Sequence, residues 1–576
     1  MNISSWLIEN LSSEVKTFFI SKEKIAVSLD SANKLIRKKS GIVDFFESEA
    51  HWLCATQISV DGGGVVAERS QKEYGDYQTN EELATAVISL IDPTGQPDVV
   101  LEPTCGKGNF ILAAVTSFPN LRRVIGVEVY LPYVWETKYK LLAYFISNPD
   151  RQPPKISILH KSFFDLDLSR IAEEIKALKV LVLGNPPWAM NADLSNMDSS
   201  NLPRKTNKQR MSGMDAITGK SNFDIAESIL LTLLENFHER EGALAVLVKN
   251  SVIKNLLEKQ QINRFSISNI QVLEIDAKKE FNVSVNCSLL YAIMGEVAEY
   301  QAKKSDFYVG ETETTFGWVG NKFVANVDMY IKNSSIDELS EVVWRQGVKH
   351  DCTKVMELEP SEGLFVNKNG DIVELESRFV HHLLKSSDLK GELIESGRKR
   401  IIMTQRKVGQ DTSYIANEAP LTYAYLSQNE AAFARRKSSI YKGKPKFSIF
   451  GVGDYSFAPY KVAISGMYNR TRFSLVTPGP DGKPIMLDDT CYLVGFDALD
   501  IATEVWSLLN GKEVQDFLAS IIFQDAKRKI TKDVLMRICL VKAIETTRLE
   551  NRNAEFPTLE RYLEEQGESA DQLALF

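Results

Sequence analysis

Val180-Leu181-Val182-Leu183-Gly184-Asn185-Pro186-Pro187-Trp188 sets the architecture of this chain. Its four aliphatic residues carry no charge and predict a fully buried parallel strand, which the two prolines end abruptly. Open α/β sheets bind their ligands at the carboxyl ends of such strands. We therefore expect the Asn-Pro-Pro-Trp corner to face a ligand.

The corner offers two hydrogen-bond acceptors beside a flat aromatic face. Each proline fixes its own φ at about −65° and restricts the residue before it, which holds the Asn185 side-chain amide and the Pro186 carbonyl outward. An exocyclic amino group could donate to both acceptors while its conjugated ring stacks on Trp188. A Pro-Pro corner is also a common loop start, so the tetrapeptide alone leaves both interpretations open.

A glycine loop upstream has the features of a nucleoside site. Residues 98–102 predict a strand, Gly106 and Gly108 permit a tight turn, and a helix follows. Glu128 ends the next predicted strand, twenty positions after Gly108, as expected of an acid that binds ribose hydroxyls. The loop lacks the third glycine of a dinucleotide fingerprint and the Gly-Lys-Ser/Thr end of a P-loop, which favours a ligand without phosphate.

Two further positions lie beside these predicted strands. Thr79 precedes an amphipathic helix, and Glu82 three residues later completes a capping-box pattern, although the Thr79 hydroxyl could instead help to hold a ligand carboxylate. Phe163 follows the third predicted strand, residues 155–159. Its ring could cover an adenine or belong to the core.

Composition restricts the class of protein. The 576 residues predict two or three domains, and 44% hydrophobic with 25% charged residues indicate a soluble globular chain. No apolar run approaches the roughly 18 residues of a membrane span. The six cysteines are widely separated, without a Cys-x-x-Cys pair, so we expect no disulfide framework, no metal site and a cytoplasmic location.

Together these motifs resemble those of the gamma-type amino-methylating, S-adenosylmethionine-dependent DNA methyltransferases, the adenine-N6 enzymes of restriction-modification systems. The order is the same: a Thr segment, the glycine loop, the ribose acid, Asn-Pro-Pro-Trp and a C-terminal recognition domain. The resemblance covers residues 70–300 and, more loosely, the C-terminal half. It implies a Rossmann-like α/β core, with a mostly parallel seven-stranded sheet whose last strand is antiparallel, and an α+β DNA-recognition domain.

The resemblance also assigns roles to individual residues. Those that would bind the cofactor S-adenosylmethionine are Thr79, Glu102, Pro103, Gly106, Gly108, Glu128 and Phe163. Those that would act on a flipped adenine in double-stranded DNA are Asn185, Pro186, Pro187, Trp188 and Phe281. Trp188 and Phe281 would cover the two faces of the base, whose extrusion costs a few kcal/mol.

Two positions depart from the pattern of these enzymes. Ser162 stands before Phe163 where the family often has Asp, and Asn80 follows Thr79 where the family usually has Pro. Both departures could weaken cofactor affinity. Neither removes a group that acts on the target.

The C-terminal half carries a basic stretch although the net charge of the chain is −8. Residues 397–472 hold fourteen Lys or Arg against four Asp or Glu, which leaves −18 for the remainder. Trp344 to Asp351 resembles the opening of a target-recognition domain. The basic stretch, like the polar loop of residues 189–222, predicts contact with DNA phosphates, helped by seven aromatic residues: Tyr414, Tyr423, Tyr441, Phe447, Tyr455, Phe457 and Tyr460.

The expected domains are a helical segment of residues 1–70, a catalytic domain of 71–330, a recognition domain of 331–548 and a flexible acidic tail of 549–576. The tail ends in Gln572-Leu573-Ala574-Leu575-Phe576. This pentapeptide resembles the motif with which bacterial replication proteins bind the sliding clamp, through Gln572, Leu573, Leu575 and Phe576. The same apolar side chains could instead fold back onto this protein's own surface.

Three other functions stay open at this point. The corner also occurs in cytosine-N4 DNA methyltransferases, and in methyltransferases of RNA bases or of glutamine in release factors. A DNA-binding subunit without catalytic activity is a third alternative. A cognate restriction endonuclease is an expected partner of a restriction-modification enzyme, but no fused nuclease motif is evident in the sequence.

Overall fold

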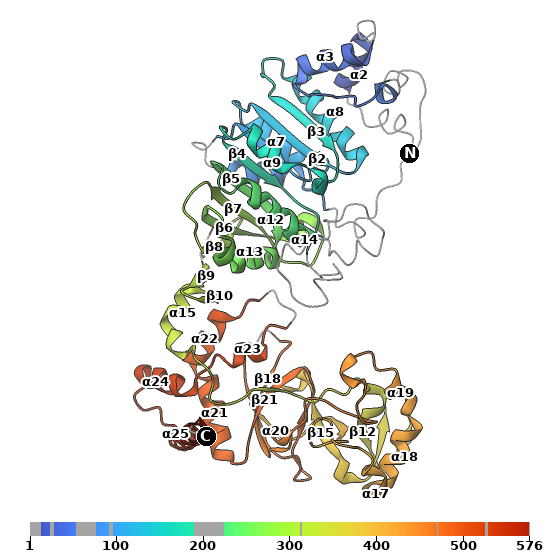
Figure 1. Cartoon of the computed structure of the whole chain (residues 1–576), viewed down its shortest axis with the longest axis vertical. Helices are drawn as coiled ribbons and strands as arrows, with labels where there is room; N and C mark the ends of the chain where they lie inside the picture. The colour runs from blue at the N-terminus through green and yellow to red at the C-terminus, as the bar shows by residue number, and fades with distance from the viewer. Residues whose placement is uncertain are drawn as a thin grey trace. The chain divides into compact units, whose positions relative to one another are not determined.

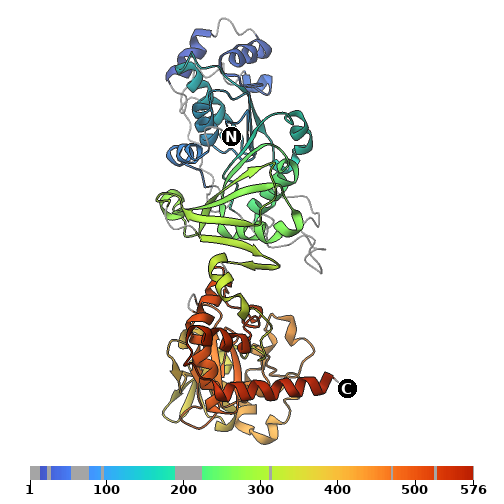
Figure 2. The same ribbon diagram turned by 90° about the vertical axis from the view of Figure 1, so that its left-hand side faces the viewer.

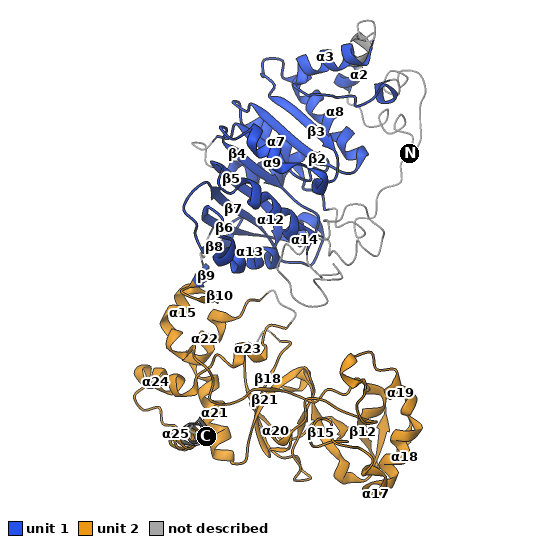
Figure 3. Ribbon diagram, in the orientation of Figure 1, with its two compact units in different colours: residues 1–318 blue, residues 319–576 orange. Residues whose placement is uncertain are grey.

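The computed structural model describes residues 13–22, 28–52, 77–91, 96–188, 224–310, 314–468, 471–524 and 528–574. The chain forms two compact units, Met1–Trp318 and Val319–Phe576 (Figure 3). The sequence predicts this boundary at residue 330, so the two units divide earlier in the chain than expected. The polar loop 189–222 lies outside the described residues.

The first unit is organised around a large sheet in the strand order β9-β8-β6-β7-β5-β4-β1-β2-β3 (Figure 1). Its strands are β1 (Val99–Glu102), β2 (Arg123–Glu128), β3 (Lys155–His160), β4 (Val180–Gly184), β5 (Gly242–Lys249), β6 (Ile267–Ile275), β7 (Cys287–Met294), β8 (Gln301–Asp306) and β9 (Thr314–Val319).

The central strands follow the predicted pattern, and the sheet then continues further. β3, β2, β1, β4 and β5 are parallel neighbours, whereas β7 is antiparallel to both β5 and β6. The antiparallel β7 agrees with the sheet that the resemblance implies, which is mostly parallel with an antiparallel last strand. Beyond β6 the sheet of the first unit adds β8 and β9 to the seven strands that the resemblance implies.

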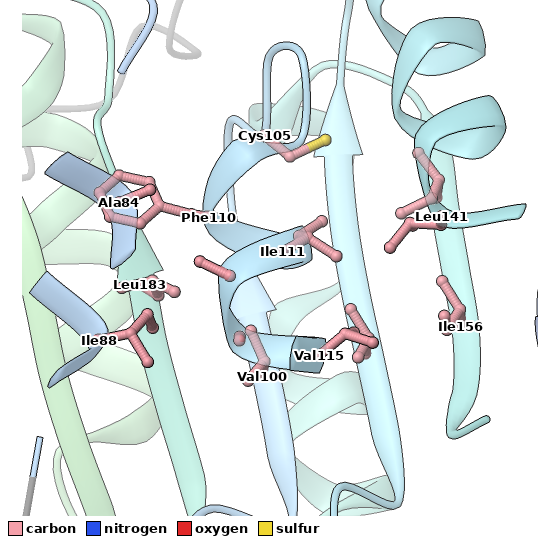
Figure 4. Packing of buried hydrophobic residues seen from close by; sticks show 14 of the residues in the cluster. Ala84, Ile88, Val100, Cys105, Phe110, Ile111, Val115, Leu141, Ile156 and Leu183 are labelled. Atoms are coloured by element: carbon pink, nitrogen blue, oxygen red, sulfur yellow. The ribbon is translucent and has the colours of Figure 1, made fainter. Parts of the chain in front are cut away.

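Helices cover both faces of this sheet. One face packs against α6 (Glu81–Ser89), α7 (Asn109–Ser117) and α8 (Leu131–Ser147), so that Val100 and Leu183 of the strands share a hydrophobic cluster with Ile88 and Ile111 of the helices (Figure 4). On the other side, α12 (Ile225–Phe237) contacts α9 (Leu168–Glu174) and α13 (Asn250–Asn263). Because both faces are buried, the strands carry apolar runs rather than alternation.

The described part of the N-terminal segment belongs to the first unit. Helices α2 (Ser13–Lys22) and α3 (Leu29–Ser40) both contact α8, and Ile42 pairs with Ile156 of β3. The fully buried Lys138 donates from Nζ to the Phe45 carbonyl at 3.1 Å and to the Glu47 carboxylate at 2.9 Å. This ion pair fixes the segment against α8.

The second unit is α+β and contains two sheets. Their orders are β11-β21-β18-β19-β16 and β14-β13-β12-β17-β15-β20. The first sheet comprises β11 (Arg345–Gln346), β16 (Leu393–Ile394), β18 (Tyr460–Ser465), β19 (Ser474–Val476) and β21 (Cys491–Phe496). The second comprises β12 (Glu357–Ser361), β13 (Leu364–Asn367), β14 (Ile372–Val373), β15 (Val380–Leu384), β17 (Lys399–Ile402) and β20 (Met486–Leu487).

Helices complete the second unit. The longer ones are α15 (Val327–Asn333), α18 (Pro420–Gln428), α21 (Leu499–Asn510), α22 (Lys512–Ile521), α24 (Leu540–Glu550) and α25 (Pro557–Ala574). α15 contacts α22, and α21 contacts both α22 and α25. These contacts surround one hydrophobic cluster of the unit.

The C-terminal segment corrects the sequence prediction of a flexible tail. Helix α25 runs from Pro557 to Ala574 (Figure 2). Phe556, Leu559 and Leu563 are buried in the second unit's core, so apolar burial offsets the acidic composition. The side chains of Gln572 and Leu573, and the residues Leu575 and Phe576, lie outside the described part. Over the described residues, no helix has the length and apolarity that a membrane crossing requires.

Candidate functional site

The predicted site residues come together where neighbouring parallel strands end. Glu102 ends β1, Glu128 ends β2, and Asn185 follows the last residue of β4. β1 lies between β2 and β4 in the sheet. The structure thus brings the predicted cofactor acids and the predicted catalytic corner to one edge of the sheet.

The Asn185 amide is oriented by the segment before α6. Its Nδ2 donates to the Tyr77 carbonyl at 2.8 Å and to the Thr79 hydroxyl at 3.2 Å. Within the described residues, no group donates to its buried Oδ1. Because both amide hydrogens are used by the protein, the atom left for a ligand is an acceptor.

Thr79 does not cap α6, contrary to the capping-box interpretation. Asn80 is the N-cap, and its side chain accepts from the Leu83 N–H at 2.7 Å. The buried Thr79 accepts from Asn185 through its hydroxyl and from Asn109 through its carbonyl, at 2.8 Å. The position predicted to bind cofactor therefore also holds the candidate catalytic amide in place.

Glu102 is a buried carboxylate without enough partners. It is 2% exposed, and among the described residues its Oε2 has no hydrogen-bond partner. Burial, followed by the charge of Glu128, raises the pKa of Glu102 well above its usual range. A cationic ligand group would remove this penalty. The ammonium and sulfonium of S-adenosylmethionine are such groups, so the residues present fit this cofactor.

The glycine loop is held against Glu128 and Gln78. The Glu128 carboxylate accepts from the Gly106 N–H at 3.0 Å and from the Tyr130 N–H at 2.7 Å. Gly106 has a φ of +50°, and a Cβ there would lie 2.3 Å from Oε1 of Gln78, so the position favours glycine. These contacts fix the end of β2 beside the loop, which is the place predicted for ribose.

Phe163 and Pro103 lie near the same edge. Phe163 begins a short 3-10 turn after β3, is 4% exposed and contacts Phe164 at 5.4 Å between ring centroids. Pro103 follows Glu102 directly and lies 3.6 Å from a Cβ placed on Gly184, so the first strand's end approaches that of β4.

Trp188 and Phe281 contact each other directly. Their ring centroids are 5.0 Å apart with an interplanar angle of 75°, and the Tyr77 ring lies 5.4 Å from that of Trp188. A base stacked between two parallel rings needs about 7 Å between them, twice the usual stacking distance. The predicted sandwich therefore requires Phe281 to move, or to contact the base at its edge.

The sequence interpretation missed Lys249 and Asp224. Lys249 ends β5, next to β4, and donates from Nζ to the Trp188 carbonyl at 3.0 Å and to Asp224 at 2.6 Å. Burial raises the pKa of Asp224, although its pairing with Lys249 opposes the shift. The available signal for Lys249 was a charged residue directly after the apolar run of β5, because β5 ends at the same edge of the sheet as the other predicted site residues.

The basic stretch of the second unit divides into exposed and internal residues. The exposed cations for which the described residues provide no ion pair are Arg406, Lys407, Arg435, Lys437, Lys442 and Lys444. Arg436 is internal: it lies 3.7 Å over the Tyr441 ring and donates to the Ser448 carbonyl at 2.6 Å.

The seven aromatic residues of this stretch pack within the second unit, and all except Phe447 are half-buried. Phe447 is 1% exposed, and Tyr414, Tyr423 and Phe457 pack against the same cluster. Tyr455 and Tyr460 pack against two other clusters, and Tyr441 holds Arg436. The exposed cations are left as the candidates for phosphate contact.

The sheet, its glycine loop and the polar groups at the ends of β1, β2 and β4 are those expected of a methyltransferase. The chain is 36% identical over 472 residues to the type II methyltransferase M.NspV of Nostoc sp. (strain ATCC 29411 / PCC 7524), which covers 81% of this chain and 96% of that protein. The chain therefore belongs to the type II methyltransferases, which implies S-adenosylmethionine as methyl donor. No family model matches the chain.

Solved structures are similar at lower identity. The type IIG restriction endonuclease BpuSI is 13% identical, with a TM-score of 0.35, over 80% of this chain and 58% of that one. A type I restriction-modification methyltransferase subunit from Streptococcus thermophilus is 15% identical, with a TM-score of 0.29, over 50% of this chain and 55% of that one.

Proposed function

We propose that this protein transfers a methyl group from S-adenosylmethionine to the N6 amino group of a flipped adenine in double-stranded DNA, as the modification enzyme of a restriction-modification system. The observation that carries the proposal is the orientation of Asn185. Its Nδ2 is bound by Tyr77 and Thr79, and its buried Oδ1 is an acceptor without a partner in the described part. An exocyclic amine supplies the missing donor.

The residues would then act by positioning. Asn185 Oδ1 and the Pro186 carbonyl accept the two N–H groups of the amine, which draws the nitrogen toward sp³ geometry and stabilises the positive charge that develops on it. Trp188 supplies the stacking face, and its backbone is held by Lys249. When bound, the cofactor supplies an electrophilic methyl group. No base is required before attack, because the proton leaves afterward.

The cofactor would lie along the ends of β1 and β2. Glu102 is placed to meet a cationic group, Glu128 to accept from ribose hydroxyls, and Phe163 to cover the adenine ring. The loop at Gly106 allows the backbone to approach closely, since it has no side chain there.

A transfer assay tests the substrate class. Purified protein with tritiated S-adenosylmethionine is offered duplex DNA, ribosomal RNA or a release-factor protein as acceptor, with Asn185→Ala as the control for contaminating enzymes. We expect label in duplex DNA alone. Label only in RNA or protein would overturn the proposal, and no label in any acceptor would favour the non-catalytic alternative.

Long-read sequencing of host DNA then decides the base. Adenine-N6 and cytosine-N4 are both exocyclic amines and would make the same two hydrogen bonds at Asn185 and Pro186. The order of the motifs favours adenine. Modified cytosines at the mapped sites would replace the adenine proposal while keeping the mechanism, and the mapped sequence supplies the duplex used in the experiments below.

A further inference from the structure

Glu280 joins two segments that lie far apart in the sequence. Its side chain is 9% exposed. Oε2 accepts from Nδ2 of Asn80 at 3.0 Å, and Oε1 accepts from the Tyr308 hydroxyl at 2.7 Å. Lys279 Nζ lies 3.4 Å from Oε1. Burial opposes ionisation, but the hydrogen bonds from Tyr308, Asn80 and Lys279 lower the pKa of Glu280, so the carboxylate is charged at neutral pH.

One end of this bridge reaches the candidate catalytic amide. Asn80 directly follows Thr79, whose hydroxyl accepts from Asn185. The Asn80 side chain uses both of its functions: Oδ1 caps α6 through the Leu83 N–H, and Nδ2 donates to Glu280. Proline, which the gamma-type enzymes usually carry here, could make neither bond.

The other end reaches the predicted target aromatic. Glu280 directly precedes Phe281 in the five-residue helix α14 (Ala277–Phe281). Asp276 caps this helix at its start, and Asn282 ends it with a φ of +57°. Because the helix has little more than one turn, immobilising Glu280 also fixes the backbone that carries Phe281, 5.0 Å from Trp188.

We propose that Asn80 and Glu280 are positioning residues that set the distance between the Asn185 acceptor and the Phe281 ring, and so shape the pocket for the target base. The inference rests on the proposed DNA methylation. It explains why a charged side chain is buried beside an aromatic residue: the carboxylate connects the Thr79 segment to α14. Loss of the bridge should weaken productive binding of the target base more than binding of the cofactor.

Asn80→Asp separates the bridge from the helix cap. Aspartate caps a helix as well as asparagine, so α6 should keep its N-terminal cap. It places a second carboxylate against Glu280, which should lower kcat/KM for the mapped duplex about tenfold at about pH 8. The loss should shrink near pH 6, where the two carboxylates can share a proton. The dissociation constant for S-adenosylmethionine should stay within about threefold of the wild-type value.

A second substitution should reverse the effect. In Asn80→Asp with Glu280→Gln, the new amide donates to the new carboxylate and can still accept from Tyr308, so kcat/KM should return to within about threefold of wild type. Asn326→Asp is the matched control, because Asn326 caps α15 in the same way, by accepting from the Met329 N–H at 2.9 Å. It should change nothing.

The outcomes distinguish the inference from the proposed function. A wild-type chain that does not methylate DNA would overturn both. An active wild type with Asn80→Asp equal to Asn326→Asp, or a double variant no better than the single one, would overturn only the bridge. If Asn80→Asp fails to fold, Asn80→Ser retains a capping oxygen without the amide, and its kcat/KM should fall at least about threefold for the inference to stand.

Discussion

Two buried carboxylates, one in each unit, have opposite surroundings. In the first unit, the buried Glu102 has one carboxylate oxygen without a partner among the described residues. In the second unit, Glu357 is 4% exposed and accepts from Lys385 at 2.5 Å and Lys399 at 3.3 Å, with His350 Nε2 at 3.5 Å. The pKa of Glu102 is raised, whereas the pKa of Glu357 is lowered to about 2.

This difference distinguishes a ligand-binding site from a structural ion pair. A folded protein pairs its buried polar groups, so a group left unpaired at the ends of parallel strands indicates that a ligand completes it. Glu102 and Asn185 meet this description in the first unit. Glu357 instead connects β12, β15 and β17 of one sheet through its lysine partners, and needs no ligand.

The largest expected effect comes from removing the unpaired acceptor. Asn185→Ala should lower single-turnover methyl transfer by about 100-fold or more, because a polar group aimed at developing charge supplies a factor of this size. Binding of S-adenosylmethionine, measured by calorimetry, should stay within a few fold. Near-normal turnover would remove Asn185 from the mechanism and end the distinction between the two units.

Removing the paired carboxylate should affect stability instead. Glu357→Gln should lower the free energy of unfolding by roughly 2–3 kcal/mol at neutral pH, because two lysines lose their buried counter-ion. The unfolded carboxylate titrates near pH 4.3 and the folded one near pH 2. The contribution is therefore complete above the unfolded value and is lost as the pH falls through the folded one.

Urea unfolding of Glu357→Gln and wild type from neutral pH to about pH 2 measures this effect. The difference between the two proteins should shrink over the acidic part of the range. Glu430→Gln is the matched control, because the Glu430–Lys446 pair is exposed and should contribute less than about 1 kcal/mol. A Glu357→Gln protein as stable as wild type at neutral pH would show that the pairing does not support the fold.

Lys461 is the exception within the second unit. It is fully buried in β18, and within the described residues its Nζ donates only to the Ala458 carbonyl. Burial lowers the pKa of Lys461 to about 7. The unfolded side chain titrates near pH 10.4, so from about pH 7 to that value the unfolded chain binds the extra proton and stability rises with pH.

Lys461→Met should therefore stabilise the protein by about 1–2 kcal/mol near pH 6 and by less near pH 9. The measurement is the free energy of unfolding at both pH values. Lys442→Met, at an exposed position, should change neither. A destabilised Lys461→Met at pH 6 would mean that the ammonium has a function that its surroundings do not reveal.

The sequence could predict the strand ends because local patterns specify them. The apolar run of β4, the two glycines and the acid after β2 each have a signal within a few residues. Thr79 and Asn80 show the limit of such signals. Either residue could cap α6 by the same short-range rule. The Thr79 hydroxyl instead accepts from Asn185, more than a hundred residues away, and Asn80 is the cap.

Burial in the second unit depends on contacts that no local pattern contains. Phe447 and Arg436 lie in a stretch that is basic and aromatic in sequence, yet both face inward. Likewise α25 reads as an acidic tail, although Leu559 and Leu563 are four positions apart and pack on one side of a helix. The prediction of a flexible tail rested on the acidic composition and did not use this spacing.

The smallest expected effect distinguishes cations that face solvent from one that faces the core. Arg435→Glu and Lys437→Glu should each remove about one unit from the slope of log affinity for DNA against log salt, without changing the melting temperature, because both side chains are exposed. Arg436→Glu should instead lower the melting temperature. Its guanidinium donates to the carbonyls of Ser448 and Phe433 and lies over Tyr441, so a carboxylate there would face acceptors. A salt slope that responds only to Arg436 would place the DNA on another surface.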